Sequence, residues 1–351
     1  MKSPVEFASA CPVSLKEYPT VTMAHGGGGK LMHDLLEKIF FAAFDANSTP
    51  NRHDSAILEL PVNRIAFTTD SYVVRPIFFP GGDIGSLAVH GTVNDLAMSG
   101  ARPAWLSAAF ILHEGLPMET LWRVVCSMRE AARRCGVRIV TGDTKVVDAT
   151  TGEGLYINTS GIGVVEHSLQ IGAASVQSGD AVLVNGDVGR HGMAVMSVRE
   201  GLSFQGSIQS DSGPLFNAVE ALLSNQVEVH CLRDLTRGGL ASALNEIAEA
   251  AGHGIAIEEE AIPVRGDVHA ACEMLGLDPL QVACEGRFVA FVPERDAARA
   301  LEILRSQEAE ANAKVIGRVD RREPPWVVMK NSLGSLRALD TPVGELLPRI
   351  C

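Results

Sequence analysis

Residues 83–112, DIGSLAVHGTVNDLAMSGARPAWLSAAFIL, predict a helix followed by a strand. The carboxylate of Asp83 can cap the start of a helix, and an apolar run then continues to Met98. Gly100 can end this helix, because glycine readily adopts the left-handed conformation found after a helix C-terminus. The apolar residues from Trp105 to Leu112 then predict a strand, so this stretch indicates layered helices and strands.

The same alternation extends outward in both directions. The spacing of apolar residues predicts helices over 31–44 and 121–132 and strands over 64–69, 137–146 and 155–165. A second block begins near Asp180 and predicts strands over 181–185 and 288–292, with helices over 214–223, 239–251 and 295–305. Both blocks are therefore of the mixed α/β or α+β class.

A chain of 351 residues is long enough for two domains of ordinary size. We expect an N-terminal extension with a glycine-rich loop and first helix over 1–44, and a first α/β domain over 45–168. A second α/β domain is expected over 169–330, followed by a flexible tail over 331–351 that has little periodicity and carries Cys351.

Composition excludes several classes of partner. The formal net charge is -12 and no basic stripe offsets it, which argues against nucleic acid and anionic membranes as partners. No apolar run is long enough to span a bilayer, so we expect no membrane association. The 7 cysteines are scattered without a CxxC pair, a pattern typical of reduced cysteines, and we therefore expect a cytoplasmic protein.

A glycine run stands directly before the first predicted helix. Gly27, Gly28 and Gly29 let backbone N–H groups approach an anion, and the helix that begins near Lys30 favours negative charge at its N-terminus. The loop is not a Walker A motif, because Leu31 stands where that motif has Ser or Thr. A phosphate cradle and a flexible turn both remain open for this loop.

Five aspartates recur at predicted strand ends or helix junctions, in segments that also contain Gly, Thr or Ser. They are Asp54, Asp70, Asp95, Asp143 and Asp234. Each one alone reads as a cap or turn residue. Together they are what chemistry on a magnesium-bound nucleotide requires, because Mg²⁺ takes hard oxygen ligands and shares them with phosphates. Thr69, Thr144 and Lys145, which adjoin these aspartates, can then contact phosphoryl oxygens.

These motifs resemble one family along nearly the whole chain. The matching segments are HGGGGKLM at 25–32, TDSYVV at 69–74, FPGGDIG at 79–85, GTVNDLAMSGA at 91–101, GDTKV at 142–146, DLTRGG at 234–239 and PRIC at 348–351. They are similar to the HypE family of hydrogenase maturation factors, within the aminoimidazole ribonucleotide synthetase-like superfamily. The terminal PRIC segment separates this family from the other members of the superfamily.

The resemblance implies a two-domain fold in which the N-terminal domains pair their sheets in a homodimer. It also implies binding of ATP and Mg²⁺, with Asn94 among the nucleotide-binding residues. A carbamoyl group delivered to Cys351 by the carbamoyltransferase HypF would be dehydrated to an S-cyanide. Cyanide would then pass to the iron of a [NiFe]-hydrogenase through the HypC–HypD complex.

The reaction needs a base that removes protons from the carboxamide nitrogen. We assign this role to Glu285, with Lys145 assisting, and keep His90 as a second candidate. The residues alone also allow Glu285 to be a surface turn and His90 to be a structural histidine.

Two other functions remain open at this point. One is an ATP-dependent small-molecule kinase or synthetase of the same superfamily, which would have no use for Cys351. The other is a nucleotide-binding scaffold without catalysis, against which the set of five acidic motifs argues.

Overall fold

The computed structural model describes residues 18–26, 30–44, 64–148, 154–201, 208–307, 311–321 and 324–340. Contacts divide the chain into two compact units. The N-terminal unit comprises Met1–Phe78, Gly82–Val93 and Pro103–Val164. The C-terminal unit comprises Phe79–Gly81, Asn94–Arg102 and Val165–Cys351, so residues 94–98, the end of the helix predicted from Asp83, cluster with the second unit.

The N-terminal unit contains a four-stranded sheet with the order β1-β6-β4-β5. Its strands are β1 (Ile65–Tyr72), β4 (Arg102–His113), β5 (Arg138–Val147) and β6 (Leu155–Val164). A separate short pair, β2 (Phe78–Phe79) and β3 (Gly82–Asp83), precedes the first long helix. β1 and β6 are antiparallel, whereas β4 and β5 are parallel, so the sheet is mixed.

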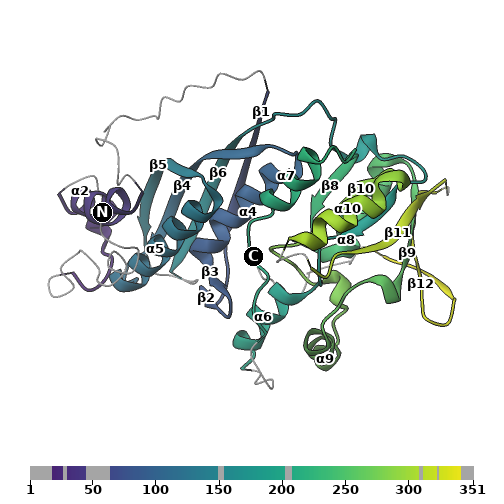
Figure 1. Cartoon of the computed structure of the whole chain (residues 1–351). Helices are drawn as coiled ribbons and strands as arrows, with labels where there is room; N and C mark the ends of the chain where they lie inside the picture. Colours follow the sequence, from purple (N-terminus) through teal and green to yellow (C-terminus); the bar gives the residue numbers. More distant parts are fainter. Residues whose placement is uncertain are drawn as a thin grey trace. The chain divides into compact units, whose positions relative to one another are not determined.

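Helices α4 (Ile84–Met98) and α5 (Met118–Cys135) lie along the sheet of this unit (Figure 1). The carboxylate of Asp83 accepts the N–H groups of Gly85 and Ser86 at 2.7 and 3.2 Å, which confirms the predicted helix cap. α5 buries one apolar stripe and ends at Gly136, whose φ of 67° is left-handed, as expected for a glycine after a helix.

The first helix differs from the continuous one predicted over 31–44. Residues 30–44 are divided into α2 (Lys30–Leu35), a π-helical turn η2 (Leu36–Phe41) and α3 (Ala42–Phe44). A separate 3₁₀ turn, η1 (Met23–Gly26), stands before them in the sequence. The π turn buries Ile39 and Phe40, and the Phe40 ring lies 4.8 Å from that of Phe110 in β4. The π turn thus places these two side chains in the core. The spacing of apolar residues alone did not predict a π turn.

The C-terminal unit contains a seven-stranded sheet with the order β13-β12-β9-β11-β7-β10-β8. Its strands are β7 (Ala181–Val184), β8 (Cys231–Asp234), β9 (Gly254–Glu258), β10 (Phe288–Val292), β11 (Lys314–Asp320), β12 (Val327–Lys330) and β13 (Leu336–Ala338). The pairings are antiparallel except for that of β12 with β9.

Helices cover both faces of this sheet (Figure 1). α8 (Gly239–Ala251) lies on one face, and α7 (Phe216–Ser224) and α10 (Glu294–Ser306) lie on the other. α6 (Arg190–Arg199) and α9 (Gly266–Leu275) pack against each other in a separate cluster. The unit also has short turns η3 (Ala173–Ser175), η4 (Glu259–Ala261) and η5 (Pro279–Gln281). Val182 and Phe291 pack on the α8 side, while Leu183 and Ala290 pack with α7 and α10. This two-sided cover explains why β7 and β10 are continuous apolar runs.

The predicted tail over 331–351 needs correction at its start. Residues 331–335 form a turn in which Asn331 Oδ1 accepts the N–H groups of Leu333 and Ser335. β13 then pairs with β12, and Leu339 donates to the carbonyl of Val327. These residues are therefore an edge hairpin of the second sheet, held by backbone bonds that periodicity cannot reveal. Residues 341–351 lie outside the described chain.

No helix among the described residues combines the length and the apolar character that a membrane span requires.

Candidate active site

The predicted base Glu285 lies in the turn that leads into β10. The continuous apolar strand after it fixes the chain direction, and the N–H of Cys284 donates to Leu235 O at 2.9 Å. Only glycine fits at position 286, because a Cβ there would lie 1.9 Å from the carbonyl oxygen of Asp211. The close approach of the two segments buries the Glu285 side chain, whose residue is 5% exposed.

Hydrogen bonds hold the Glu285 backbone on both sides. Oδ2 of Asp211 accepts the N–H groups of Glu285 and Gly286 at 3.1 and 3.0 Å. Nδ2 of Asn94 donates to the Glu285 carbonyl at 3.2 Å and to Gly213 O at 3.0 Å. Oδ1 of Asn94 accepts the N–H of Leu215 at 2.8 Å. These hydrogen bonds fix the position of the turn.

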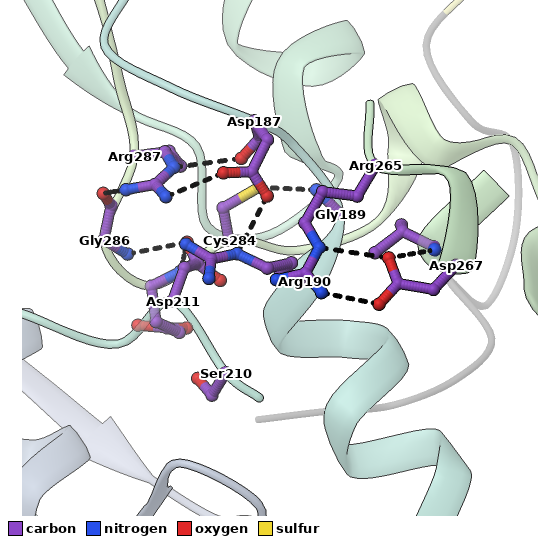
Figure 2. A network of polar contacts seen from close by, with 12 residues as sticks. Asp187, Gly189, Arg190, Ser210, Asp211, Arg265, Asp267, Cys284, Gly286 and Arg287 are labelled. Atoms are coloured by element: carbon purple, nitrogen blue, oxygen red, sulfur yellow. Dashed lines mark hydrogen bonds and ion pairs between the residues drawn. The ribbon is translucent and has the colours of Figure 1, made fainter. Parts of the chain in front are cut away.

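A buried ion pair supports the same turn from the other side (Figure 2). The Arg287 guanidinium meets Asp187 Oδ1 at 3.0 Å and donates to the carbonyls of Asp187 and Gly286 at 2.9 and 2.8 Å. Arg190 approaches the second oxygen of Asp187 at 2.8 Å. Burial disfavours the guanidinium charge, but Asp211 and Asp187 raise the pKa of Arg287 above its usual value. Arg287 is therefore a permanent cation beside the turn.

Two further buried groups in this network are neutral near pH 7. Burial raises the pKa of the Cys284 thiol well above its usual value, and Sγ accepts the N–H of Gly189 at 3.1 Å. Burial lowers the pKa of His191 to about 4, although Asp211 opposes this shift. Cys284 is thus a packing thiol, not a nucleophile. His191 forms a 2.9 Å contact from Nδ1 to Ser210 Oγ.

In the N-terminal unit, Lys145 and Asp143 form an exposed ion pair on β5. The ammonium lies 3.1 Å from Asp143 Oδ2, with the side chains 65% and 58% exposed. In the parallel pairing they stand beside Ile111 and Ala109 of β4. Neighbouring Thr144 stands beside Phe110 and is buried. Because side chains alternate along a strand, Asp143 and Lys145 project from the face opposite to the helices.

Asp70 and Thr69 divide between the two faces in the same way. Asp70 pairs with Thr159, whose hydroxyl donates to Ala88 O in α4, so Asp70 lies on the helix-covered face. Thr69 lies on the open face, where its hydroxyl accepts from Ser160 at 2.8 Å. Within this unit, Asp70 and Asp143 therefore do not meet.

Three of the aspartates lie inside elements, which corrects the expectation that each one marks a strand end or helix junction. Asp70 lies in β1 because the pairing with β6 continues to Tyr72, two residues farther. Asp143 lies within β5, and Asp95 lies within α4. Asp234 is the last residue of β8, as expected for a strand end.

The second candidate base, His90, is half-buried on α4. Burial, assisted by the charge of Arg134, lowers its pKa to about 4. His90 is a neutral imidazole near pH 7 and a weaker base than an ordinary histidine, which makes it less suited to the role.

The other predicted site residues lie at the border of the described chain or beyond it. Lys30 begins α2, and its side chain is outside the described part. Gly27, Gly28, Gly29, Asp54 and Cys351 lie outside the described residues. Among the residues that the structure describes, no group of three or more His, Cys, Asp or Glu side chains could hold a metal ion.

Sequence reasoning missed Asp187, Asp211 and Arg287, which organise the Glu285 turn. These residues come together from positions up to 100 apart, so no local spacing connects them. The signal available in the sequence was a charged residue next to a wholly apolar strand. Asp187 follows β7 and Arg287 precedes β10, and neither strand contains a charged residue. Charges in such places are expected to be paired when buried.

Comparison with known proteins decides the family. Residues 52–165 match the model of the AIR synthase related protein N-terminal domain, and residues 177–328 match the corresponding C-terminal domain. The chain is 49% identical over 332 residues to the carbamoyl dehydratase HypE of Azotobacter vinelandii, which covers 95% of this chain and 97% of the relative. The chain belongs to the HypE family.

Solved HypE structures share its fold. A crystal structure of the hydrogenase maturation protein HypE in complex with ATP has a TM-score of 0.90 and 45% identity, covering 95% of this chain and all 100% of that one. A chain from the HypE-HypF complex has a TM-score of 0.77 and 44% identity, covering 90% of this chain and 100% of that chain. The HypE resemblance and the two-domain AIR synthase-related fold are thus confirmed.

Proposed function

We propose that this chain uses ATP to dehydrate the S-carboxamide carried by its own Cys351 to an S-cyanide, for the cyanide ligands of [NiFe]-hydrogenase. The observation that carries the proposal is 49% identity, over nearly the full length of both chains, to a protein named carbamoyl dehydratase. A HypE relative of 45% identity that binds ATP supports the nucleotide requirement.

The chemistry explains why ATP is needed. The carboxamide oxygen is a poor leaving group, but transfer of the γ-phosphoryl group to it creates a phosphate that departs readily. Loss of two protons from nitrogen then forms the C≡N bond. The carboxamide and ATP yield the S-cyanide, ADP, phosphate and a proton, so the oxygen of the carboxamide ends in the phosphate.

Glu285 is our candidate for the base. Its backbone is held by Asp211 and Asn94, and such preorganisation keeps a reacting group within the narrow range of productive positions. Asn94 uses its amide for these bonds, so its role in nucleotide binding remains a prediction. Lys145 is the candidate that stabilises phosphoryl charge, because its ammonium is exposed and forms an ion pair with a similarly exposed Asp143.

The residues fit Mg²⁺ as ligands shared with phosphate, not as a complete cage. Mg²⁺ typically takes one or two carboxylates together with substrate phosphates and water. Asp143 is an exposed carboxylate of this kind, and Asp70, Asp95, Asp234 and Asp54 remain candidates. When bound, the ion would neutralise charge on the transferred phosphoryl group.

We also propose a homodimer formed through the open face of the N-terminal sheet. This face carries exposed Ile65 and Phe67 on β1 and Ile111 on β4, with Phe67 68% exposed. Exposed apolar side chains gathered on one sheet face are typical of a protein interface.

Partner proteins follow from the proposed reaction. The HypE-HypF complex among the solved relatives supports a HypF carbamoyltransferase as the donor. Transfer to a HypC–HypD complex and a cytoplasmic location remain predictions, the latter supported by five free cysteines among the described residues.

The test starts from protein carbamoylated at Cys351 by a HypF carbamoyltransferase. With ATP, we expect one ADP for each C-terminal peptide that loses one water. The Cys351→Ala variant should form neither product. ADP release without the loss of water would contradict a dehydratase and favour the kinase or synthetase alternative.

A further inference from the structure

We propose that Asp211 is a positioning residue for the dehydration reaction, acting through the backbone of Glu285. The inference rests on the proposed role of Glu285 as the base and adds a residue whose contribution neither the motifs nor the family comparison indicates. Asp211 belongs to the segment 208–215 that leads into α7, 74 positions before Glu285.

The contact is specific to the Glu285 turn. One carboxylate oxygen, Oδ2, accepts two consecutive N–H groups at 3.1 and 3.0 Å. A charged acceptor makes hydrogen bonds roughly twice as strong as those of a neutral one. The carbonyl of Asp211 lies against Gly286, where a Cβ would be only 1.9 Å away. Both the side chain and the main chain of Asp211 therefore determine where Glu285 stands.

The other carboxylate oxygen of Asp211, Oδ1, makes no such hydrogen bonds among the described residues. Oδ1 of Asp211 is buried and, within the described part of the chain, has no hydrogen-bond partner. An asparagine at this position can thus place its amide oxygen at the Oδ2 site and its NH₂ group at the Oδ1 site. Asp211→Asn keeps the acceptor for both N–H groups, whereas Asp211→Ala removes it.

A matched control exists in the same unit. Asp180 is also a buried carboxylate, and its Oδ2 accepts the N–H of Gln177 at 2.8 Å and meets His230 Nδ1 at 2.7 Å. It lies before β7, whereas the Glu285 turn adjoins the other end of that strand, where Asn185 donates to Phe288. Asp180→Ala should therefore destabilise the unit without displacing Glu285.

Two readouts test the proposal on the full-length, carbamoylated protein. The first readout is the single-turnover rate of S-cyanide formation, measured over a range of ATP concentrations. It gives the maximal rate and the KM for ATP. Asp211→Ala should lower the rate on the order of 100-fold, because a displacement of about 1 Å has this effect, while KM stays within about twofold. Asp211→Asn should recover most of the loss, and Asp180→Ala should keep a rate within about threefold of the wild type.

The second readout is hydrogen exchange of the Glu285 and Gly286 amides, which needs no activity. Exchange should accelerate in Asp211→Ala and stay slow in Asp211→Asn and Asp180→Ala. Near-normal rates in Asp211→Ala, an equal loss in Asp180→Ala, or no recovery in Asp211→Asn would each overturn the proposal. A wild-type chain that forms no S-cyanide would instead contradict the proposed function, while the exchange experiment still tests the positioning contact.

Discussion

Replacing Gly286 by alanine should separate Asp211 from the Glu285 turn. The new Cβ would lie 1.9 Å from the Asp211 carbonyl oxygen, whereas real Cβ contacts are essentially never below 3.0 Å. The two segments must therefore part by about 1.1 Å, the difference between these distances. The bonds from Glu285 and Gly286 to Asp211, now 3.1 and 3.0 Å, would then exceed hydrogen-bonding distance.

The cost follows from these two bonds. A hydrogen bond to a charged group contributes about 1.5–3 kcal/mol, so losing both should lower the free energy of unfolding by at least about 3 kcal/mol. For a unit of this size that corresponds to a fall in Tm of roughly 6–12 °C, measured by circular dichroism. The rate of S-cyanide formation should fall on the order of 100-fold.

Gly266→Ala provides the matched control for this substitution. Nothing lies within 4 Å of a Cβ at Gly266, which begins α9. We expect a change in stability within about 0.5 kcal/mol and an unchanged rate. If Gly286→Ala melted within 2 °C of the wild type (below the roughly 6 °C expected) and remained fully active, the close contact would not be what holds Glu285.

Three other perturbations test separate parts of the molecule. Lys145→Ala should abolish S-cyanide formation yet change the free energy of unfolding by less than about 1 kcal/mol, because its ion pair is exposed. Lys330→Ala, which removes another exposed ion pair, should change neither the activity nor the stability. Equal losses of activity in the two variants would contradict the role of Lys145. Since burial lowers the pKa of His191 to about 4, the unfolded chain binds a proton that the folded chain does not between about pH 6.5 and 4. The free energy of unfolding should therefore decrease as the pH is lowered through this window, by about 2–3 kcal/mol at pH 4.5. Urea unfolding should show a smaller decrease for His191→Gln, and identical pH profiles for the two proteins would refute this. Phe67→Asp should convert a dimer to a monomer in light scattering, whereas Leu333→Asp, at an exposed position of the other unit, should remain dimeric; a dimeric Phe67→Asp would place the interface elsewhere.

The elements that could be predicted well from the sequence have a pattern of apolar residues along their whole length. α8 has the bounds expected from its apolar stripe, and β10 has those expected from a continuous run of buried residues. α6 was missed because both of its faces are buried, which leaves no amphipathic spacing. β13 was missed because a three-residue exposed edge strand is held by backbone pairing with little side-chain pattern. β12 was missed because its short run of buried apolar residues shows no alternation.

In the candidate site, too, residues without a local sequence pattern could not be predicted from the residues alone. Glu285 could be proposed because the whole chain resembles one family, not because its neighbours indicate a base. Asn94 was expected to bind nucleotide, but its contact with the Glu285 backbone, like the whole contribution of Asp211, became visible only in the structure, since each residue belongs to a different segment. Asp70 and Asp143 occur in similar motifs but project from opposite faces of one sheet, a separation that depends on strand register.

The fate of the carboxamide oxygen tests the proposed reaction most directly. Cys351 would be carbamoylated with ¹⁸O-labelled carbamoyl groups, ATP added, and the inorganic phosphate and the C-terminal peptide both analysed by mass spectrometry. We expect the peptide to lose the labelled oxygen and the label to appear in phosphate. Label retained on the peptide, or released into water while the S-cyanide forms, would contradict activation of the carboxamide by ATP.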